Sequence, residues 1–150
     1  MNEKILYINR GVAGSGKSTK AKQLAPKENI FSTDDFWMKD GKYIFNPALL
    51  GEAHQWNIDR VDNALNEGKS PIVVDNTNIK KRDYAAYLSL ARRYGYEVQY
   101  SLPDSPWWKE IYPRIKDGTF TDKDVMEFFV ENTHNVPYEA IKRMMENWQE

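Results

Sequence analysis

Residues 11–18 have the types and spacing of a loop that binds phosphate groups. Their sequence, GVAGSGKS, matches the pattern G-x-x-x-x-G-K-[ST] at every fixed position. Glycines allow the backbone to curl until successive N–H groups point at phosphate oxygens, and a following helix adds its positive N-terminal end. We therefore expect Lys17 to reach the β- and γ-phosphates of ATP or GTP, and Ser18 to bind Mg²⁺. The residues expected to contact the nucleotide are Gly11, Ala13, Gly14, Ser15, Gly16, Lys17, Ser18 and Thr19.

Asp34 and Asp35 follow residues 29–32, a short segment that we expect to form a second strand. In an open α/β sheet, ligands bind beyond the carboxyl ends of the strands, so this pair should lie near the terminal phosphate. Phosphate-binding loops serve hydrolases, switches and kinases alike, and a kinase also needs a carboxylate that takes the proton of the acceptor hydroxyl. The alternative is that Ser32, Thr33 or one aspartate caps a following helix. Both roles can be filled, one by each aspartate.

Asp75 ends the apolar run 71–75, which is typical of a buried parallel strand. An aspartate at this position near a phosphate-binding loop commonly binds Mg²⁺ or its waters. The alternative is that it caps the next helix or braces the loop. Asn76, Thr77 and Asn78 follow, and such short polar side chains hold tight turns by bonding to their own backbone.

Lys80, Lys81 and Arg82 continue the chain directly after this turn. Three consecutive cations beside the expected site would suit an anionic acceptor. The equally simple alternative is the solvent-exposed start of a helix. Asn76, Asn78, Lys81 and Arg82 are thus candidates for the acceptor side.

The composition limits the remaining classes of function. The chain has 150 residues, 41% hydrophobic and 29% charged, which indicates one globular domain over residues 1–150. A net charge of −1 argues against tight sequence-blind nucleic-acid binding, although a local basic groove is compatible with it. The absence of cysteine excludes disulfides and thiolate metal sites, and His54 and His134 are too far apart to indicate zinc. No signal peptide or membrane-spanning run is recognisable, so we expect a cytoplasmic protein.

Strands and helices alternate along the first two thirds of the chain. The pattern predicts strands at 4–10, 29–32, 71–75 and 96–102, and helices at 17–24, 47–68 and 80–94. After a loop at 103–108, it predicts helices at 107–117, 121–131 and 137–150, with Thr121 and Asp124 spaced as a capping box. The alternation predicts an α/β fold with a parallel sheet and helices on its faces.

Blocks along residues 5–148 resemble the kinase domain of phage polynucleotide 5′-hydroxyl kinase. The residues are the glycine loop, STDDFW from residue 32, and VVDNTN from residue 73. Relatives in animal ubiquitin-ligase-binding proteins and small phage proteins are closer still. They share blocks similar to residues 41–57, 71–78, 94–98 and 132–144. The order D-D-[FY], D-N-T-N, H-x-V-P is much more specific than the loop alone.

The resemblance implies a P-loop kinase-like three-layer α/β/α sandwich with about four parallel strands. It also implies a helical C-terminal lid over the nucleotide, here residues 104–150. The reaction would be phosphoryl transfer to a hydroxyl of a nucleic acid or nucleotide, often the 5′-OH of DNA or RNA. Asp34 maps onto the general base, and Lys17 and Ser18 carry over directly. A phage-encoded protein of this kind would act in the host cytoplasm.

Two positions depart from the family pattern. Trp37 stands where the polynucleotide kinase has an arginine that helps bind phosphate near the acceptor, and a tryptophan can stack on a base instead. Glu131 stands where the family often has a lid arginine that stabilises charge on the transferring phosphate. Arg114 or Lys116, from the inserted stretch 109–125, are candidates to supply that charge.

His54 and Asn57 lie one turn apart at the edge of the apolar face of the helix expected at 47–68. They are interpreted either as half-buried structural residues or as an acceptor-binding edge. His134 and Trp148 are expected to be packing or lid residues. Two further hypotheses remain: a kinase for a small molecule or a modified base in DNA, and a non-catalytic nucleotide-binding domain.

Overall fold

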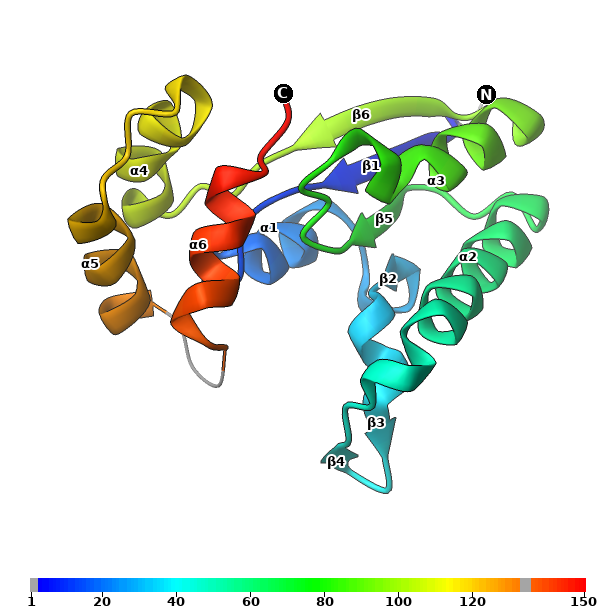
Figure 1. Cartoon of the computed structure of the whole chain (residues 1–150). Helices are drawn as coiled ribbons and strands as arrows, with labels where there is room; N and C mark the ends of the chain where they lie inside the picture. The colour runs from blue at the N-terminus through cyan, green and yellow to red at the C-terminus, as the bar shows by residue number, and fades with distance from the viewer. Residues whose placement is uncertain (1–2, 133–135) are drawn as a thin grey trace.

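The computed structural model describes residues 3–132 and 136–150, so His134 lies outside the described residues. Its centre is a sheet of four parallel strands, shown in Figure 1. The strands are β1 (Ile5–Asn9), β2 (Ile30–Phe31), β5 (Ile72–Asp75) and β6 (Glu97–Ser101), in the order β2-β5-β1-β6. All four residues of β5 are buried, as its uninterrupted apolar run predicts.

Helices cover both faces of this sheet. Successive side chains of a strand point to opposite faces, so both faces carry apolar side chains that the helices bury. Helices α2 (Leu50–Asn66) and α3 (Lys81–Tyr94) pack with Leu6, Ile8, Ile72 and Val74. Helix α1 (Lys17–Leu24) packs against the opposite face through Ala21 and Val73. The α/β/α sandwich expected from the sequence is therefore confirmed.

Three further helices gather at one side of the sheet, on the left of Figure 1. They are α4 (Pro106–Asp117), α5 (Asp122–Asn132) and α6 (Tyr138–Glu146). Their apolar sides form a second core, which joins the sheet through Val12 after β1 and Ile79 after β5. Trp108 is its largest fully buried side chain. The helical region expected at 104–150 is therefore observed, and it packs beside the phosphate-binding loop.

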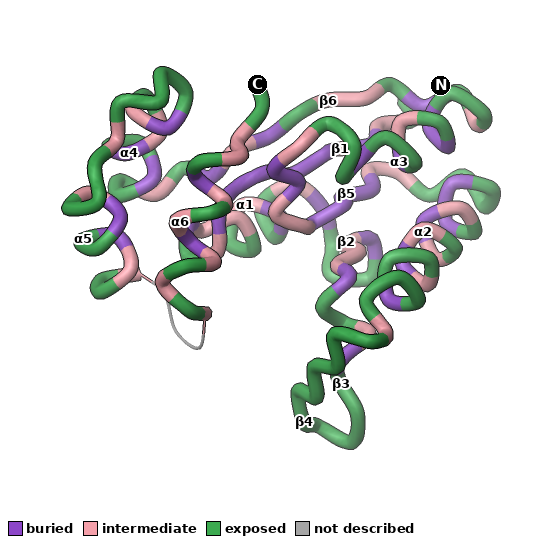
Figure 2. The backbone as a smooth tube through the Cα atoms, viewed as in Figure 1, coloured by how far each residue is buried: buried purple, intermediate pink, exposed green. Residues whose placement is uncertain are grey.

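Short elements connect the larger ones. Three are 3₁₀ helices: η1 (Lys27–Asn29), η2 (Thr33–Trp37) and η3 (Pro47–Leu49). A two-stranded antiparallel hairpin, β3 (Met38–Lys39) and β4 (Lys42–Tyr43), follows η2. Its turn, Asp40 and Gly41, has φ angles of 51° and 76°. Figures 1 and 2 show the hairpin projecting from the body with exposed backbone throughout. The sequence analysis did not predict it.

Two predicted boundaries were wrong at the C-terminal side. Helix α4 begins at Pro106, inside the expected loop, because the Ser105 hydroxyl accepts a hydrogen bond from the N–H of Trp108 at 3.2 Å. Helix α6 ends at Glu146 instead of reaching residue 150. Beyond it, the Trp148 ring lies 4.3 Å from the Arg10 guanidinium, so packing against the sheet replaces further helix.

The capping box at the start of α5 is confirmed. Asp124 accepts a hydrogen bond from the N–H of Thr121 at 2.9 Å, and the Thr121 hydroxyl accepts one from the N–H of Asp124 at 3.2 Å. Over the two described segments, we find no helix that is both long enough and apolar enough to cross a membrane.

Candidate active site

The loop between β1 and α1 has the conformation that its glycines were expected to allow. Gly14 and Gly16 have φ angles of 82° and 93°, in the region that side chains other than glycine rarely adopt. A Cβ on Gly11 would lie 2.4 Å from the Ser15 hydroxyl oxygen and 3.0 Å from Pro103 Cγ, so any larger residue would displace these neighbours. Helix α4 holds the loop from outside: the Ser105 hydroxyl donates to the carbonyl of Ser15 at 2.7 Å.

A cavity of about 550 Å³ opens over this loop and the first turn of α1. Of the residues expected to contact the nucleotide, six line it: Ala13, Gly14, Gly16, Lys17, Ser18 and Thr19. Gly11 and Ser15 are buried and do not line it, because the chain turns inward at both positions. The Trp107 indole lies on its rim and donates to the carbonyl of Gly14 at 2.9 Å.

Asp75 links the buried strand β5 to this loop. It is 4% exposed and accepts hydrogen bonds from the Ser18 hydroxyl at 3.1 Å and the Asn9 amide at 3.0 Å. The Lys17 ammonium lies 3.7 Å from the same carboxylate. Helix α3 is capped instead by Asp83, which accepts from the N–H of Lys80 at 2.9 Å, so the helix-capping alternative for Asp75 is wrong.

The two adjacent aspartates of η2 lie in different surroundings. Asp34 lines the cavity together with Lys17 and Ser18. Asp35 instead forms an ion pair with Arg60 at 3.1 Å. Ser32 supplies the cap of η2, accepting from the N–H of Asp34 at 3.2 Å. The Asp34 side chain is therefore free of the capping role, and it lines the cavity over the phosphate-binding loop.

Tyr43, from the unpredicted hairpin, is a further wall of the same cavity. Partial burial, and after it the neighbouring Asp34 carboxylate, raise the pKa of its hydroxyl. The hydroxyl therefore stays protonated and can donate to the Asp34 carboxylate. The signal that could have found the hairpin is Asp40-Gly41, the dipeptide that favours a two-residue hairpin turn.

Of the three asparagines expected on the acceptor side, Asn57 and Asn78 are buried in structural hydrogen bonds, and Asn76 is partly exposed. The Asn76 side chain accepts from the N–H of Thr33 at 2.8 Å, joining β5 to η2. Asn78 is buried and donates to the carbonyl of Asn9 at 2.8 Å. Asn57 is also buried, and its amide donates to the Tyr87 hydroxyl at 2.9 Å. Buried hydrogen-bonded amides of this kind are structural.

His54 and Arg82 line a separate cavity of about 340 Å³ between α2 and α3. His54 is exposed, so the first of its two alternatives, a half-buried structural residue, is wrong. The backbone N–H of Lys81 donates a hydrogen bond to the Gln149 side chain at 2.8 Å, which joins the start of α3 to the C-terminal segment. The cations at 80–82 therefore start a helix and do not line the cavity over the phosphate-binding loop.

Trp37 does not offer a free face to a base. It is 2% exposed, and its ring meets Phe36 and Phe45 edge to face at centroid distances of 5.1 and 4.9 Å. The aromatic cluster fixes η2 to the hairpin instead. The expected stacking role of Trp37 is therefore wrong.

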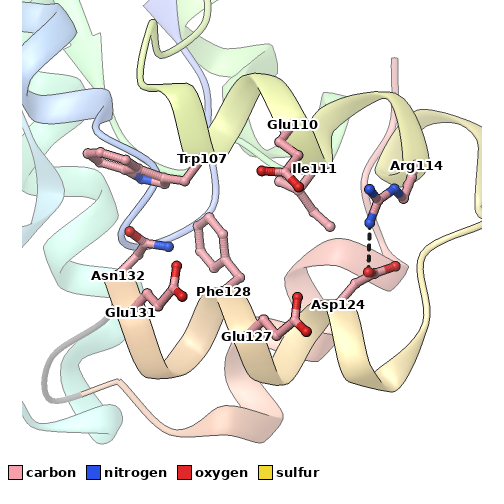
Figure 3. A pocket seen from close by; sticks show the side chains of 9 residues that line it. All are labelled: Trp107, Glu110, Ile111, Arg114, Asp124, Glu127, Phe128, Glu131 and Asn132. Atoms are coloured by element: carbon pink, nitrogen blue, oxygen red, sulfur yellow. Dashed lines mark hydrogen bonds and ion pairs between the residues drawn. The ribbon is translucent and has the colours of Figure 1, made fainter.

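Neither candidate for the lid charge reaches the cavity. Arg114 pairs with Asp124 at 2.6 Å, in a small pocket between α4 and α5 that Glu131 also lines, as Figure 3 shows. Lys116 lies 3.8 Å from the Glu150 carboxylate. Among the described residues that line the nucleotide cavity, Lys17 is the one cationic side chain.

Comparison with known proteins places this geometry in context. A family model described as an AAA domain matches residues 6–149. Human NEDD4-binding protein 2 is 37% identical over 148 residues, which is 97% of this chain. The match spans 8% of the length of that relative, so it concerns one part of a much longer protein.

Proposed function

Because the chain belongs to the AAA domain family, we propose that it is a P-loop phosphotransferase that uses ATP or GTP. The observation that supports this most is the shared cavity. Asp34 lines the same 550 Å³ space as Lys17 and Ser18, so a donor phosphate and an acceptor hydroxyl could meet there. A pure nucleotide-binding domain has no need of a carboxylate on that wall that forms no ion pair with any described residue.

In the proposed reaction, the loop and Lys17 hold the β- and γ-phosphates. Asp34 takes the proton of the acceptor hydroxyl while the oxygen of that hydroxyl forms a bond to the γ-phosphorus. The bond between that phosphorus and the β–γ bridging oxygen breaks, and the nucleoside diphosphate leaves with the electron pair. Positioning and charge supply most of the catalysis in such transfers.

Mg²⁺ suits the oxygen donors beside the loop. Among the described residues, no group of three or more His, Cys, Asp or Glu side chains is arranged so that it could hold a metal ion by itself. The ion commonly takes one or two protein oxygens and completes its shell with water and phosphate oxygens. Ser18 and the buried Asp75, which are hydrogen-bonded to each other, would hold it. When bound, it supplies positive charge to the transferring phosphate.

The acceptor we propose is the 5′-OH of a DNA or RNA strand. The resemblance of the D-D-[FY] and D-N-T-N blocks to the phage polynucleotide kinase supports this choice. A second candidate is a hydroxyl on a small molecule or a modified base. It is favoured by the scarcity of cations on the cavity wall, where Lys17 alone is positive among the described lining residues.

The test is transfer of label from γ-labelled ATP or GTP, with Mg²⁺, to matched acceptors. We expect labelling of an oligonucleotide with a free 5′-OH and none of the same oligonucleotide carrying a 5′-phosphate. Stronger labelling of a nucleoside or a hydroxymethylated base would select the second candidate. If a folded, nucleotide-binding protein labelled no acceptor, the proposal of a phosphotransferase would be wrong.

A further inference from the structure

The hairpin β3–β4 carries an exposed aromatic ring into the cavity of the candidate active site. Tyr43 is 57% exposed, yet it lines the cavity together with Asp34 and the phosphate-binding loop. Burial and the charge of the neighbouring Asp34 carboxylate raise the pKa of its hydroxyl. The same residue therefore lies beside the proposed base and presents a ring to the space in front of it.

The hairpin is built to hold this ring in place. Met38 pairs with Tyr43 across the two strands, and Lys39 pairs with Lys42. Positive φ angles at Asp40 and Gly41 are those of the tight two-residue turn that matches strand twist.

The base of the hairpin is fixed to the buried aromatic cluster. The N–H of Ile44 donates to the carbonyl of Trp37 at 2.8 Å. The ring of Phe45 meets that of Trp37 edge to face. Tyr43 therefore lies between the tight turn and a segment that is anchored to the buried Trp37.

We propose that Tyr43 is a specificity and positioning residue of the acceptor subsite, where its ring stacks on the terminal base of the acceptor strand and its hydroxyl orients Asp34. The inference rests on the proposed function and names the part of the acceptor that is recognised. An exposed ring is suited to this, because a base offers a π-face whatever its sequence.

The hydroxyl explains how Asp34 can be held without being blocked. A carboxylate has two oxygens and about four acceptor positions. A tyrosine that donates to one oxygen fixes the plane of the group and leaves the other oxygen for the acceptor hydroxyl. The raised pKa keeps the tyrosine a donor at neutral pH.

The neighbouring exposed side chains fit the same occupant. Met38, Ile44 and Phe45 are also exposed apolar residues of this segment. Met38 lies opposite Tyr43 across the two strands, so these two apolar side chains share one face of the hairpin. Lys39 and Lys42 point to the other face of the hairpin, because pairs alternate between faces along the strands. Base stacking rather than phosphate pairing is thus the contact that the cavity side offers.

Trp107 is the other partly exposed aromatic on the cavity, and its position differs. Its indole is bonded to the carbonyl of Gly14 in the phosphate-binding loop, on the donor side. Tyr43 lines the cavity beside Asp34, on the side where the acceptor hydroxyl must lie. The assignment of Tyr43 to the acceptor follows from this partner.

The experiment compares Tyr43→Ala and Tyr43→Phe with Tyr100→Ala as a matched control. Tyr100 is 56% exposed but lies on the edge strand β6. Steady-state phosphorylation of a 5′-OH oligonucleotide gives kcat and the acceptor KM. An oligonucleotide with 2-aminopurine as its 5′-terminal base reports stacking through fluorescence quenching.

We expect Tyr43→Ala to raise the acceptor KM about tenfold or more and to abolish the quenching, as loss of a stacked base predicts. Tyr43→Phe should keep the quenching and the KM while lowering kcat several-fold. Tyr100→Ala should match the unchanged protein, and the nucleotide KM should stay constant throughout. Tyr43→Leu provides a second variant without a ring if the alanine variant folds poorly.

Two negative results are distinguishable. If the unchanged protein phosphorylates the oligonucleotide and Tyr43→Ala keeps its KM and quenching, the inference is overturned while the proposed function stands. If the unchanged protein phosphorylates no strand at all, the polynucleotide acceptor is wrong and the inference falls with it.

Discussion

Asp34 and Asp35 show how two identical neighbours acquire different chemistry. Asp35 neutralises Arg60, whose guanidinium also lies 4.0 Å from the Trp56 ring centroid and 5.0 Å from that of Phe31. Asp34 forms no such ion pair with any described residue and instead lines the cavity with Tyr43. Since successive residues of a tight helix point in different directions, the pair separates a structural ion pair from a candidate base.

Trp37 gives a prediction at the scale of one residue. Its burial between Phe36 and Phe45 means that Trp37→Ala should lower the free energy of unfolding by about 3–5 kcal/mol. Trp107→Ala is the control, because that ring is 41% exposed and should contribute much less to stability. Urea unfolding measures both. If Trp37→Ala had near-normal stability and a raised acceptor KM, the structural role would be wrong and a stacking role would be supported.

At the scale of elements, helices α4 and α5 are joined by a short connection that the Thr121–Asp124 box organises. The N–H of Thr121 lowers the pKa of Asp124 most, and the neighbouring Arg114 charge and hydrogen bonds add to this. The pair between Arg114 and Asp124 also ties the end of α4 to the start of α5, as Figure 3 shows. This arrangement engages Arg114 structurally, far from the loop that binds phosphate.

The box predicts a pH dependence of stability. The pKa of Asp124 is lower in the folded protein than in the unfolded chain. Its contribution to the free energy of unfolding is therefore present above the unfolded pKa of about 4, and it is lost as the pH falls through the folded pKa. Asp124→Asn should therefore cost about 1 kcal/mol at pH 7 and progressively less below about pH 4. Chemical unfolding at several pH values tests this, with Thr121→Ser as a control that keeps the cap. An equal loss at every pH would show that charge is not involved.

At the scale of the molecule, the sandwich was predictable because its signals are local. The apolar run of β5, the glycine after α3 and the glycine loop before α1 each specify an element from neighbouring residues. The alternation of strands and helices then allows few arrangements. Local signals also gave the two sides of the nucleotide cavity: the loop, and a carboxylate after the second strand.

What could not be predicted depends on contacts between distant residues. The burial of Trp37 follows from its contact with Phe45, which comes after the hairpin, and α6 ends where Trp148 meets Arg10. The position of Asn57 on its helix suggested a side chain free to bind the acceptor, yet its amide donates a hydrogen bond to the hydroxyl of Tyr87 on another helix. Arg114 and Lys116 were candidates by charge alone, and their partners Asp124 and Glu150 are set by tertiary packing. Only the hairpin had a local signal, at Asp40-Gly41, that the sequence analysis missed.

The most direct test of the account is single-turnover transfer of the γ-phosphate to a 5′-OH oligonucleotide by Asp34→Asn, beside Asp35→Asn. Loss of the general base should slow transfer by about 100-fold or more while nucleotide affinity stays unchanged. Asp35→Asn, which removes only the exposed pair with Arg60, should transfer within a few-fold of the unchanged protein. Transfer by Asp34→Asn at the unchanged rate, or loss of nucleotide binding in its place, would contradict the assignment of Asp34 as the base.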